Sequence, residues 1–281
     1  MSNRIKRLLV LDATFLAYRA HYSTGRLMYG DTKIGVAFGI LRDLDTFIGL
    51  FSPDVFIFAF DYGQGGLRLQ VDPSYKRARR ERVLTKEEQR FQQSFVDQVS
   101  HLQQMILPEM GYKNILRVKG YEADDIVAQV CIDADPNEDV VIVSADEDLF
   151  QCLTSTVSLY NPAAKQMVTA QRFKEQWGID PAQWATVKSI AGCPGDGVTG
   201  IRGVGKVTAI KWLRGQLDPK CKRFNDIETQ LDLCAKNLRL IRLPFPGLEL
   251  PRIREDEVTE KKRIDMMLRL GIRGRRVTAM E

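Results

Sequence analysis

The chain has 281 residues, 44% of them hydrophobic and 27% charged, which is ordinary for a soluble protein with a sizeable core. No apolar run reaches the length of a membrane span, and the N-terminal stretch lacks the features of a signal peptide, so we expect a cytoplasmic protein. Five scattered cysteines and two histidines argue against zinc and disulfides. A net charge of +5 suits an enzyme that acts on a polyanion.

Three apolar runs, each followed by an aspartate, predict buried strands of a parallel sheet. The runs cover residues 8–11, 55–60 and 140–143, and the aspartates are Asp12, Asp61 and Asp146. Helical patterns separate the runs, as in a sheet that helices cover on both faces. Because ligands of such sheets bind beyond the carboxyl ends of the strands, we expect the three aspartates at one edge.

Two dense acidic clusters lie between residues 119 and 150. Glu122, Asp124 and Asp125 open a helical pattern, and Asp146 and Asp148 follow the third apolar run. Carboxylates this dense repel one another unless cations lie between them, and Mg²⁺ prefers oxygen ligands. The pattern therefore predicts a two-metal phosphodiester site. Each cluster alone could also be a helix cap or a polar strand end.

The segment after Asp61 combines glycines with positive charge. Gly63, Gly65 and Gly66 predict a mobile connection. Beyond them lie one aromatic residue and six basic ones, namely Tyr75, Arg68, Lys76, Arg77, Arg79, Arg80 and Arg82. Such a cluster can bind phosphates and stack a base, although a solvated charged face is the alternative.

Helical patterns flank this basic segment. Apolar residues 37–48 recur at helical spacing up to a stop at Ser52-Pro53. Thr85 and Glu88 form a capping box that opens a further helix, whose apolar stripe predicts core packing and which we expect to end at Pro108.

Beyond about residue 170 strand-like runs become rare. We therefore predict an α/β core over 1–180, with a basic arch near 63–100, and a helical DNA-binding region over 181–281. Within it, the glycine-rich hairpin 200–209 would allow close approach of the backbone to a phosphate, and the next helix would direct its first amides at that anion. The alternative is an ordinary helix–turn–helix connection. Residues 255–276 predict an amphipathic helix with a basic end.

Taken in order, six segments resemble the 5′-nuclease family over residues 8–250. They are LLVLDATFLAYRA, VFIFAFD, YKRAR, GYEADD, VSADEDL and GDGVTGIRGVGKVTA. That family includes the nuclease domain of bacterial DNA polymerase I, phage 5′-exonucleases and flap endonucleases. The resemblance implies a PIN-like α/β fold with a mobile helical arch and a helix–hairpin–helix. It also implies a Mg²⁺-dependent 5′-3′ exonuclease or flap endonuclease, with Mn²⁺ as a substitute, that leaves 5′-phosphates.

The resemblance also gives each candidate residue a role. The first metal cluster would comprise Asp12, Asp61, Glu122, Asp124 and Asp125, and the second Asp146, Asp148 and Asp196. Lys76 and Arg79 would act on the scissile phosphate. DNA contacts would come from Arg19, Arg68, Tyr75, Arg77, Arg80, Gly200, Gly203, Gly205 and Lys206. The hairpin would also hold a potassium ion. The implied partner is DNA with a 5′ flap, a 5′ overhang or a nick, with RNA as a further candidate and a monomer as the default.

The chain departs from the family pattern at Cys193, where the first Asp of Gly-Asp-x-x-Asp is expected, and more mildly at Ala13. A thiol is a poor Mg²⁺ ligand, so we expect weaker binding of the second metal. One alternative is therefore a protein that binds branched DNA without cutting it. A PIN-type ribonuclease and a phosphatase with an aspartyl nucleophile are others, although neither explains the hairpin and the basic arch.

Overall fold

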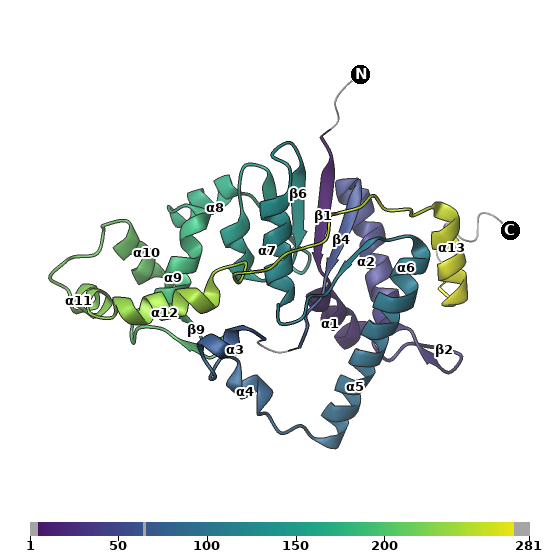
Figure 1. The fold of residues 1–281 in the computed structure, drawn as a ribbon, viewed down its shortest axis with the longest axis horizontal. Coiled ribbons are helices and arrows are strands. Elements are labelled where there is room, and N and C mark those ends of the chain that lie inside the picture. The colour runs from purple at the N-terminus through teal and green to yellow at the C-terminus, as the bar shows by residue number, and fades with distance from the viewer. Residues whose placement is uncertain (1–4, 64–65, 273–281) are drawn as a thin grey trace. The chain divides into compact units, whose positions relative to one another are not determined.

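The computed structural model describes residues 5–63 and 66–272 (Figure 1). The chain divides into two compact units. Unit 1 comprises residues 1–59, 83–116 and 251–281, and unit 2 comprises 60–82 and 117–250. The strands are mostly parallel and helices flank them, which confirms the predicted α/β fold class. These two units are defined by contacts between residues. They do not test the predicted boundary near residue 180 between an α/β core and a DNA-binding region, which stays a prediction. Gly65 of the predicted mobile connection lies outside the described residues.

The strands of unit 1 run parallel in the order β5-β4-β1. They are β1 (Arg7–Asp12), β4 (Val55–Ala59) and β5 (Asn114–Leu116). All residues of β4 are buried, as its continuous apolar run predicts. Asp12 pairs with Ala59, so β1 and β4 end at the same level. A short exposed hairpin, β2 (Met28–Tyr29) and β3 (Thr32–Lys33), follows the first helix.

Three longer helices pack together in unit 1. They are α1 (Ala13–Thr24), α2 (Gly35–Phe51) and α5 (Lys86–His101). Helix α2 stops where predicted, because Ser52 adopts a left-handed conformation with φ 46°. Helix α5 opens with the predicted capping box, in which Thr85 and Glu88 each accept from the backbone N–H of the other.

The prediction that this helical run ends at Pro108 is wrong. A π-helical turn, η1 (Leu102–Ile106), follows α5 and leads into α6 (Leu107–Met110). Pro108 lies in the first turn of α6, where a residue without an N–H is tolerated. The run ends at Gly111 instead, whose φ of 102° favours glycine.

The C-terminal part of unit 1 is anchored by one carboxylate. Asp256 accepts from the backbone amides of Phe56 (2.7 Å) and Lys113 (2.9 Å), which belong to segments distant in the sequence. Helix α13 (Glu260–Arg269) follows and confirms part of the amphipathic helix predicted over 255–276. Residues beyond 272 lie outside the described range.

Unit 2 is built on β6 (Asp139–Val143), β7 (Val157–Asn161) and β8 (Gln166–Val168). β6 and β7 are parallel, and β8 runs antiparallel to β7. Helix α7 (Ala123–Asp133) precedes β6, and the 3₁₀ helix η2 (Glu147–Cys152) follows it. Both acidic clusters therefore lie where a helix begins.

The rest of unit 2 is mostly helical, as predicted. Phe150, Phe173 and Trp184 pack edge-on or tilted against one another in its core. Its helices are α8 (Ala170–Trp177), η3 (Pro181–Gln183), α9 (Trp184–Ala191), η4 (Pro194–Asp196), α10 (Lys206–Leu213), α11 (Lys222–Glu228) and α12 (Leu231–Ile241). Two-residue strands β9 (Gly192–Cys193) and β10 (Val198–Thr199) pair antiparallel.

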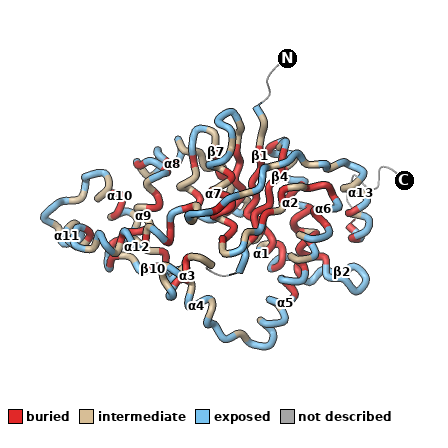
Figure 2. The backbone as a smooth tube through the Cα atoms, viewed as in Figure 1, coloured by how far each residue is buried: buried red, intermediate tan, exposed pale blue. Residues whose placement is uncertain are grey.

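The basic segment of unit 2 contains only two single helical turns, α3 (Arg68–Val71) and α4 (Arg77–Arg80). Figure 2 shows that the chain from α4 to the start of α5 is largely exposed. Among the described residues, no helix is both long and apolar enough to cross a membrane.

Candidate active site

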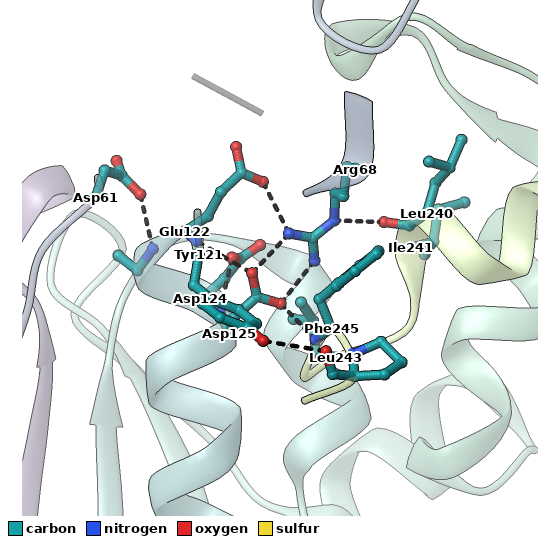
Figure 3. A network of polar contacts seen from close by, with 12 residues as sticks. Asp61, Arg68, Tyr121, Glu122, Asp124, Asp125, Leu240, Ile241, Leu243 and Phe245 are labelled. Carbon is teal, nitrogen blue, oxygen red and sulfur yellow. Dashed lines mark hydrogen bonds and ion pairs between the residues drawn. The ribbon is translucent and has the colours of Figure 1, made fainter. Parts of the chain in front are cut away.

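The first acidic cluster begins α7, and one of its members is an internal anchor (Figure 3). Asp125 is 0% exposed, and both of its oxygens accept from Arg68, at 2.6 and 2.7 Å. Its Oδ2 also accepts from the amide of Glu122 (3.1 Å), and its Oδ1 from the amide of Phe245 (2.7 Å). Four donors thus contact this carboxylate, and the metal role of Asp125 stays a prediction.

Arg68, which we predicted to contact DNA, is buried inside the protein. It is 2% exposed, its Nε donates to the carbonyl of Leu240 (2.8 Å), and its Nη1 also lies 3.3 Å from Glu122. Its guanidinium lies 5.3 Å from the centre of the Phe245 ring. Because this buried guanidinium is engaged on every side, it joins α3, α7 and the end of α12 and cannot reach a phosphate in this conformation.

Two neighbouring residues of the basic segment hold Glu122. The hydroxyl of Tyr75 donates to Oε2 (2.9 Å), and the ammonium of Lys76 donates to Oε1 (2.5 Å). Tyr75 is only 4% exposed and packs in a core with Cys193, so its ring offers no free face for stacking a base. Lys76 also lies 3.7 Å from Asp196, and its φ of 51° is a conformation that costs a non-glycine residue energy.

Asp61 and Asp124 lie at the same end of α7. Asp61 Oδ1 accepts from the amide of Ala123 (2.7 Å), which places it against the first turn of the helix. The negative charges are favourable there because they face the positive end of the helix dipole. We call Asp61, Glu122, Asp124 and Asp125 the α7 group.

Charge neutralisation is uneven within the α7 group. Burial raises the pKa of Glu122, but the nearby charges of Lys76 and Arg68 outweigh burial and leave that pKa lowered. Burial also raises the pKa of Asp124, to well above its usual value, and the charges of Asp125 and Glu122 add to that effect. Asp124 is therefore the member with the most to gain from a further cation.

The second acidic cluster surrounds the start of η2. Asp146 caps η2 by accepting from the amide of Asp148 (2.8 Å), and Asp148 Oδ1 lies 2.6 Å from the ammonium of Lys188. Arg79 lies 3.6 Å from the Asp196 carboxylate, and the amide of Lys76 donates to the Asp196 carbonyl (2.7 Å). We call Asp146, Asp148 and Asp196 the β6 group.

The β6 group is coupled electrostatically to a lysine and a thiol. Asp146 is an exposed residue, but its carboxyl is poorly solvated, which raises its pKa, and the charges of Asp148 and Asp196 raise that pKa further. Burial, followed by the charge of Asp148, raises the pKa of the Cys193 thiol to about 12, although a hydrogen bond with Lys188 opposes this. Cys193 therefore stays an uncharged thiol at neutral pH.

Lys188 is a residue that the sequence reasoning missed. It lies on α9 between buried neighbours, Val187 and Ser189, and one turn beyond the buried Trp184. A lysine four residues after a core tryptophan faces the same side of the helix, and that spacing could have indicated a buried partner.

The donor types of the two groups differ in how well they fit a metal ion. No three or more His, Cys, Asp or Glu side chains in ranges 5–63 and 66–272 are arranged to hold a metal ion. Asp61, Glu122 and Asp124 nevertheless supply only oxygen, and the raised pKa of Asp124 fits a divalent cation. The β6 group does not fit one, because an ammonium already pairs with Asp148 and an uncharged thiol lies beside it.

The predicted hairpin joins two packed helices, α9 and α10. Gly200 has no room for a side chain, since an added Cβ would lie 2.2 Å from the backbone of Ala191. Gly203 adopts a φ of 76°, and Gly205 caps α10. Lys206 pairs with Glu147, and its ammonium lies 5.4 Å from the centre of the Trp184 ring. The DNA and potassium roles of this hairpin stay predictions.

The remaining candidates have partners of their own. In unit 1, Asp12 accepts from the amide of Phe15 (3.0 Å) and caps α1, and Arg19 pairs with Asp43. In unit 2, Arg77 pairs with Glu81 at 2.7 Å. Arg80 donates to the carbonyls of Tyr75 (3.2 Å) and Pro73 (2.6 Å). Arg79 lies 3.6 Å from Asp196 with 59% of its side chain exposed, and Arg77 is more exposed still, at 65%. The metal or DNA roles of these residues stay predictions.

Curated proteins similar to this chain are bacterial DNA polymerases I. The thermostable DNA polymerase I of Thermus thermophilus is 27% identical over 256 residues, which cover 89% of this chain and 29% of the polymerase. The DNA polymerase I of Synechocystis is 32% identical over 230 residues, which cover 76% of this chain and 22% of the polymerase. The chain thus spans less than a third of the length of these relatives.

Solved structures with the same fold are nucleases. T5 5′-exonuclease with bound zinc ions has a TM-score of 0.72 and 21% identity, covering 98% of this chain and 96% of that one. The T5 flap endonuclease in a product-like complex with DNA and metal ions has a TM-score of 0.71 and 21% identity, covering 94% and 98%. The catalytic core of Rad2 with a DNA substrate has a TM-score of 0.59 and 15% identity, covering 98% and 91%.

The family itself is shown by a match over most of the chain. Residues 7–178, which include Asp146, Asp148 and the whole α7 group, match the family model described as the 5′-3′ exonuclease, N-terminal resolvase-like domain. The predicted resemblance is confirmed by this match. The chain belongs to the 5′-3′ exonuclease family.

Proposed function

We propose that the chain is a divalent-metal-dependent, structure-specific 5′ nuclease. It hydrolyses phosphodiester bonds near the 5′ ends of DNA that carries a flap, an overhang or a nick, and leaves 5′-phosphate products. The related DNA polymerases and the T5 and Rad2 structures with metal ions or DNA support this class of reaction.

One observation carries the proposal. The ammonium of Lys76 lies 2.5 Å from Glu122 and 3.7 Å from Asp196, so both acidic groups converge on one cation of the basic segment. Arg79 lies beside the same Asp196 carboxylate. A point where two carboxylate groups and two basic side chains meet suits the binding of a phosphate together with a metal ion.

The α7 group is the candidate holder of the metal ion, through Asp61, Glu122 and Asp124. Mg²⁺ bound there would supply Lewis-acid stabilisation of phosphate charge and a more acidic bound water. Arg68 and Asp125 position the group, because their buried pair fixes the first turn of α7. Tyr75 orients Glu122 through its hydroxyl.

Lys76 and Arg79 are the candidate phosphate contacts. Each now faces a carboxylate, and an entering phosphate would take the place of that carboxylate as the partner of the cation. Charge that develops on the phosphate oxygens would then be stabilised where it forms.

Other parts of the proposal concern binding rather than chemistry. The glycine hairpin and the N-terminus of α10 would bind the backbone of the downstream duplex, so selection would follow structure rather than sequence. A potassium ion at the hairpin, RNA as a further substrate, a monomeric state and the cytoplasm stay predictions.

The direct test is a gel assay on a 5′-flap duplex in which each strand is end-labelled in turn. We expect cleavage at the flap junction with Mg²⁺, none with EDTA, and a product end that ligates without a kinase step. Asp124→Asn is the matched loss-of-ligand variant and should bind the flap without cutting it. Tight binding by the native chain without cleavage at any Mg²⁺ or Mn²⁺ concentration would favour a branched-DNA-binding protein instead.

A second test separates chemistry from steering. Lys76→Ala and Arg79→Ala should lower the single-turnover rate by about 10²-fold, typical for loss of one transition-state donor, with little change in affinity. Lys174→Ala is the control, because its half-exposed side chain pairs with Asp180 and the residue is not among the predicted DNA contacts. A loss confined to affinity would assign Lys76 and Arg79 to plain electrostatic attraction.

A further inference from the structure

We propose that the β6 group holds no divalent cation and that the ammonium of Lys188 is its resident positive charge. The inference rests on the proposed function, since it assigns the divalent cation of the reaction to the α7 group alone. Three observations on Asp148, Cys193 and Asp196 carry it.

The first observation is the position of Lys188. Its ammonium lies 2.6 Å from Asp148 Oδ1, and both side chains are only 14% exposed. The residue belongs to α9, whose neighbouring turns carry the buried Trp184 and Ile190. Because α9 is held by core packing, the backbone of Lys188 does not move away with a loop, and a divalent ion entering at Asp148 would meet the positive charge of its ammonium.

The second observation is the side chain at position 193. Cys193 is 6% exposed and packs with Tyr75, Ala185 and Val198 in an apolar core. A thiol in this setting offers neither the charge nor the oxygen that a hard cation requires. Cys193 therefore belongs to the hydrophobic core, and the neighbouring Lys188 supplies the positive charge.

The third observation is the balance of charge. Three carboxylates form the β6 group. Lys188 pairs with Asp148 at 2.6 Å, and Arg79 lies 3.6 Å from Asp196. Lys76 lies 3.7 Å from Asp196 and shares its charge with Glu122. Repulsion among the carboxylates is the usual reason for a second divalent ion, and here protein cations already offset it.

The experiment counts Mn²⁺ ions bound per chain, by electron paramagnetic resonance and calorimetry, in the metal-free 281-residue chain without DNA. Lys188→Gln combined with Cys193→Asp removes the resident charge and supplies the missing carboxylate. We expect this double variant to bind one more Mn²⁺ than the native chain. No gain in a double variant with native circular dichroism and cooperative melting would overturn the inference.

A second variant keeps the test decisive if the double variant does not fold. Asp146→Asn removes one carboxylate of the β6 group without touching Lys188. We expect the number of Mn²⁺ ions bound to be the same as in the native chain, and a loss of one ion would overturn the inference. These counts need no cleavage, so failure of the proposed nuclease activity is recognised separately, in the flap assay.

Discussion

In both acidic groups of unit 2, closely spaced carboxylates repel one another. Basic side chains from different parts of the chain offset this repulsion in the two groups. The α7 group is held by Arg68 and Lys76, from a segment with only single helical turns, and Lys76 adopts a left-handed conformation. The β6 group is held by Lys188, which projects from the packed helix α9. A cation on a short irregular segment can exchange its partner, whereas a cation on a packed helix is a permanent part of the site.

The α7 group also divides internally. Asp125 has four donors and no exposure, whereas the neighbouring Asp124 carries a strongly raised pKa. The two adjacent carboxylates thus differ in role. Asp125 stabilises the fold, whereas the negative charge of Asp124 is unfavourable until a cation binds beside it. A poorly solvated carboxylate with a raised pKa is typical of functional sites.

The largest expected effect comes from the buried anchor. Arg68→Met should destabilise the metal-free protein by about 3–5 kcal/mol, because it leaves the carboxylate of Asp125 buried without its cation. Arg77→Met is the control, and loss of its exposed pair with Glu81 should cost less than about 1 kcal/mol. Urea unfolding of both variants measures the difference. Equal losses would mean that Arg68 does not anchor the α7 group.

A smaller effect should separate the two lysines. Lys188→Gln should cost about 2 kcal/mol, as for removal of one partner of a partly buried pair, and Lys76→Gln should cost less. Glu122 would keep donors in Tyr75 and Arg68, so its charge stays compensated. Thermal melting in the presence of EDTA gives the order. If Lys76→Gln were the more damaging change, the basic segment would be as rigid as α9.

The smallest expected effect has the opposite sign. Because the folded-state pKa of Asp124 lies above its unfolded value of about 3.9, its ionised form opposes folding as pH rises through that range. Asp124→Asn should therefore stabilise the metal-free protein at pH 7, by a margin of order 1 kcal/mol, and lose this advantage below the unfolded pKa. Asp125→Asn should be destabilising over the same range. Unfolding curves at several pH values test both signs.

Local sequence patterns predicted the parts of the fold that depend on neighbouring residues. The strands at 8–11 and 140–143, the stop at Ser52 and the capping box at Thr85 all follow from apolar runs or from chemistry within a few residues. The prediction that the helix ends at Pro108 was wrong because a π-helical turn precedes this proline and leads into a further helix. No pattern of neighbouring residues indicates that turn.

Partner choice in the candidate site could not be predicted in the same way. The sequence indicates that carboxylates and cations occur, but it does not say that Arg68 turns inward to Asp125, or that Lys188 meets Asp148. These pairs form between residues distant along the chain, and packing decides them. The sequence suggested that Arg68 and Tyr75 contact nucleic acid, because nothing close to them in the sequence indicates that they are buried. Their burial depends on α12 and on Cys193, which lie far away in the sequence.

The most direct test of the account is the order of flap cleavage in Mg²⁺, measured as the single-turnover rate over a wide range of concentrations below saturation. We expect Mg²⁺-dependent cleavage at the flap junction that is first order in the ion, because the α7 group alone would hold it. A cleavage rate that is second order in Mg²⁺ would contradict the inference that the α7 group binds the ion and the β6 group does not. Absence of cleavage at every concentration would contradict the proposed function itself.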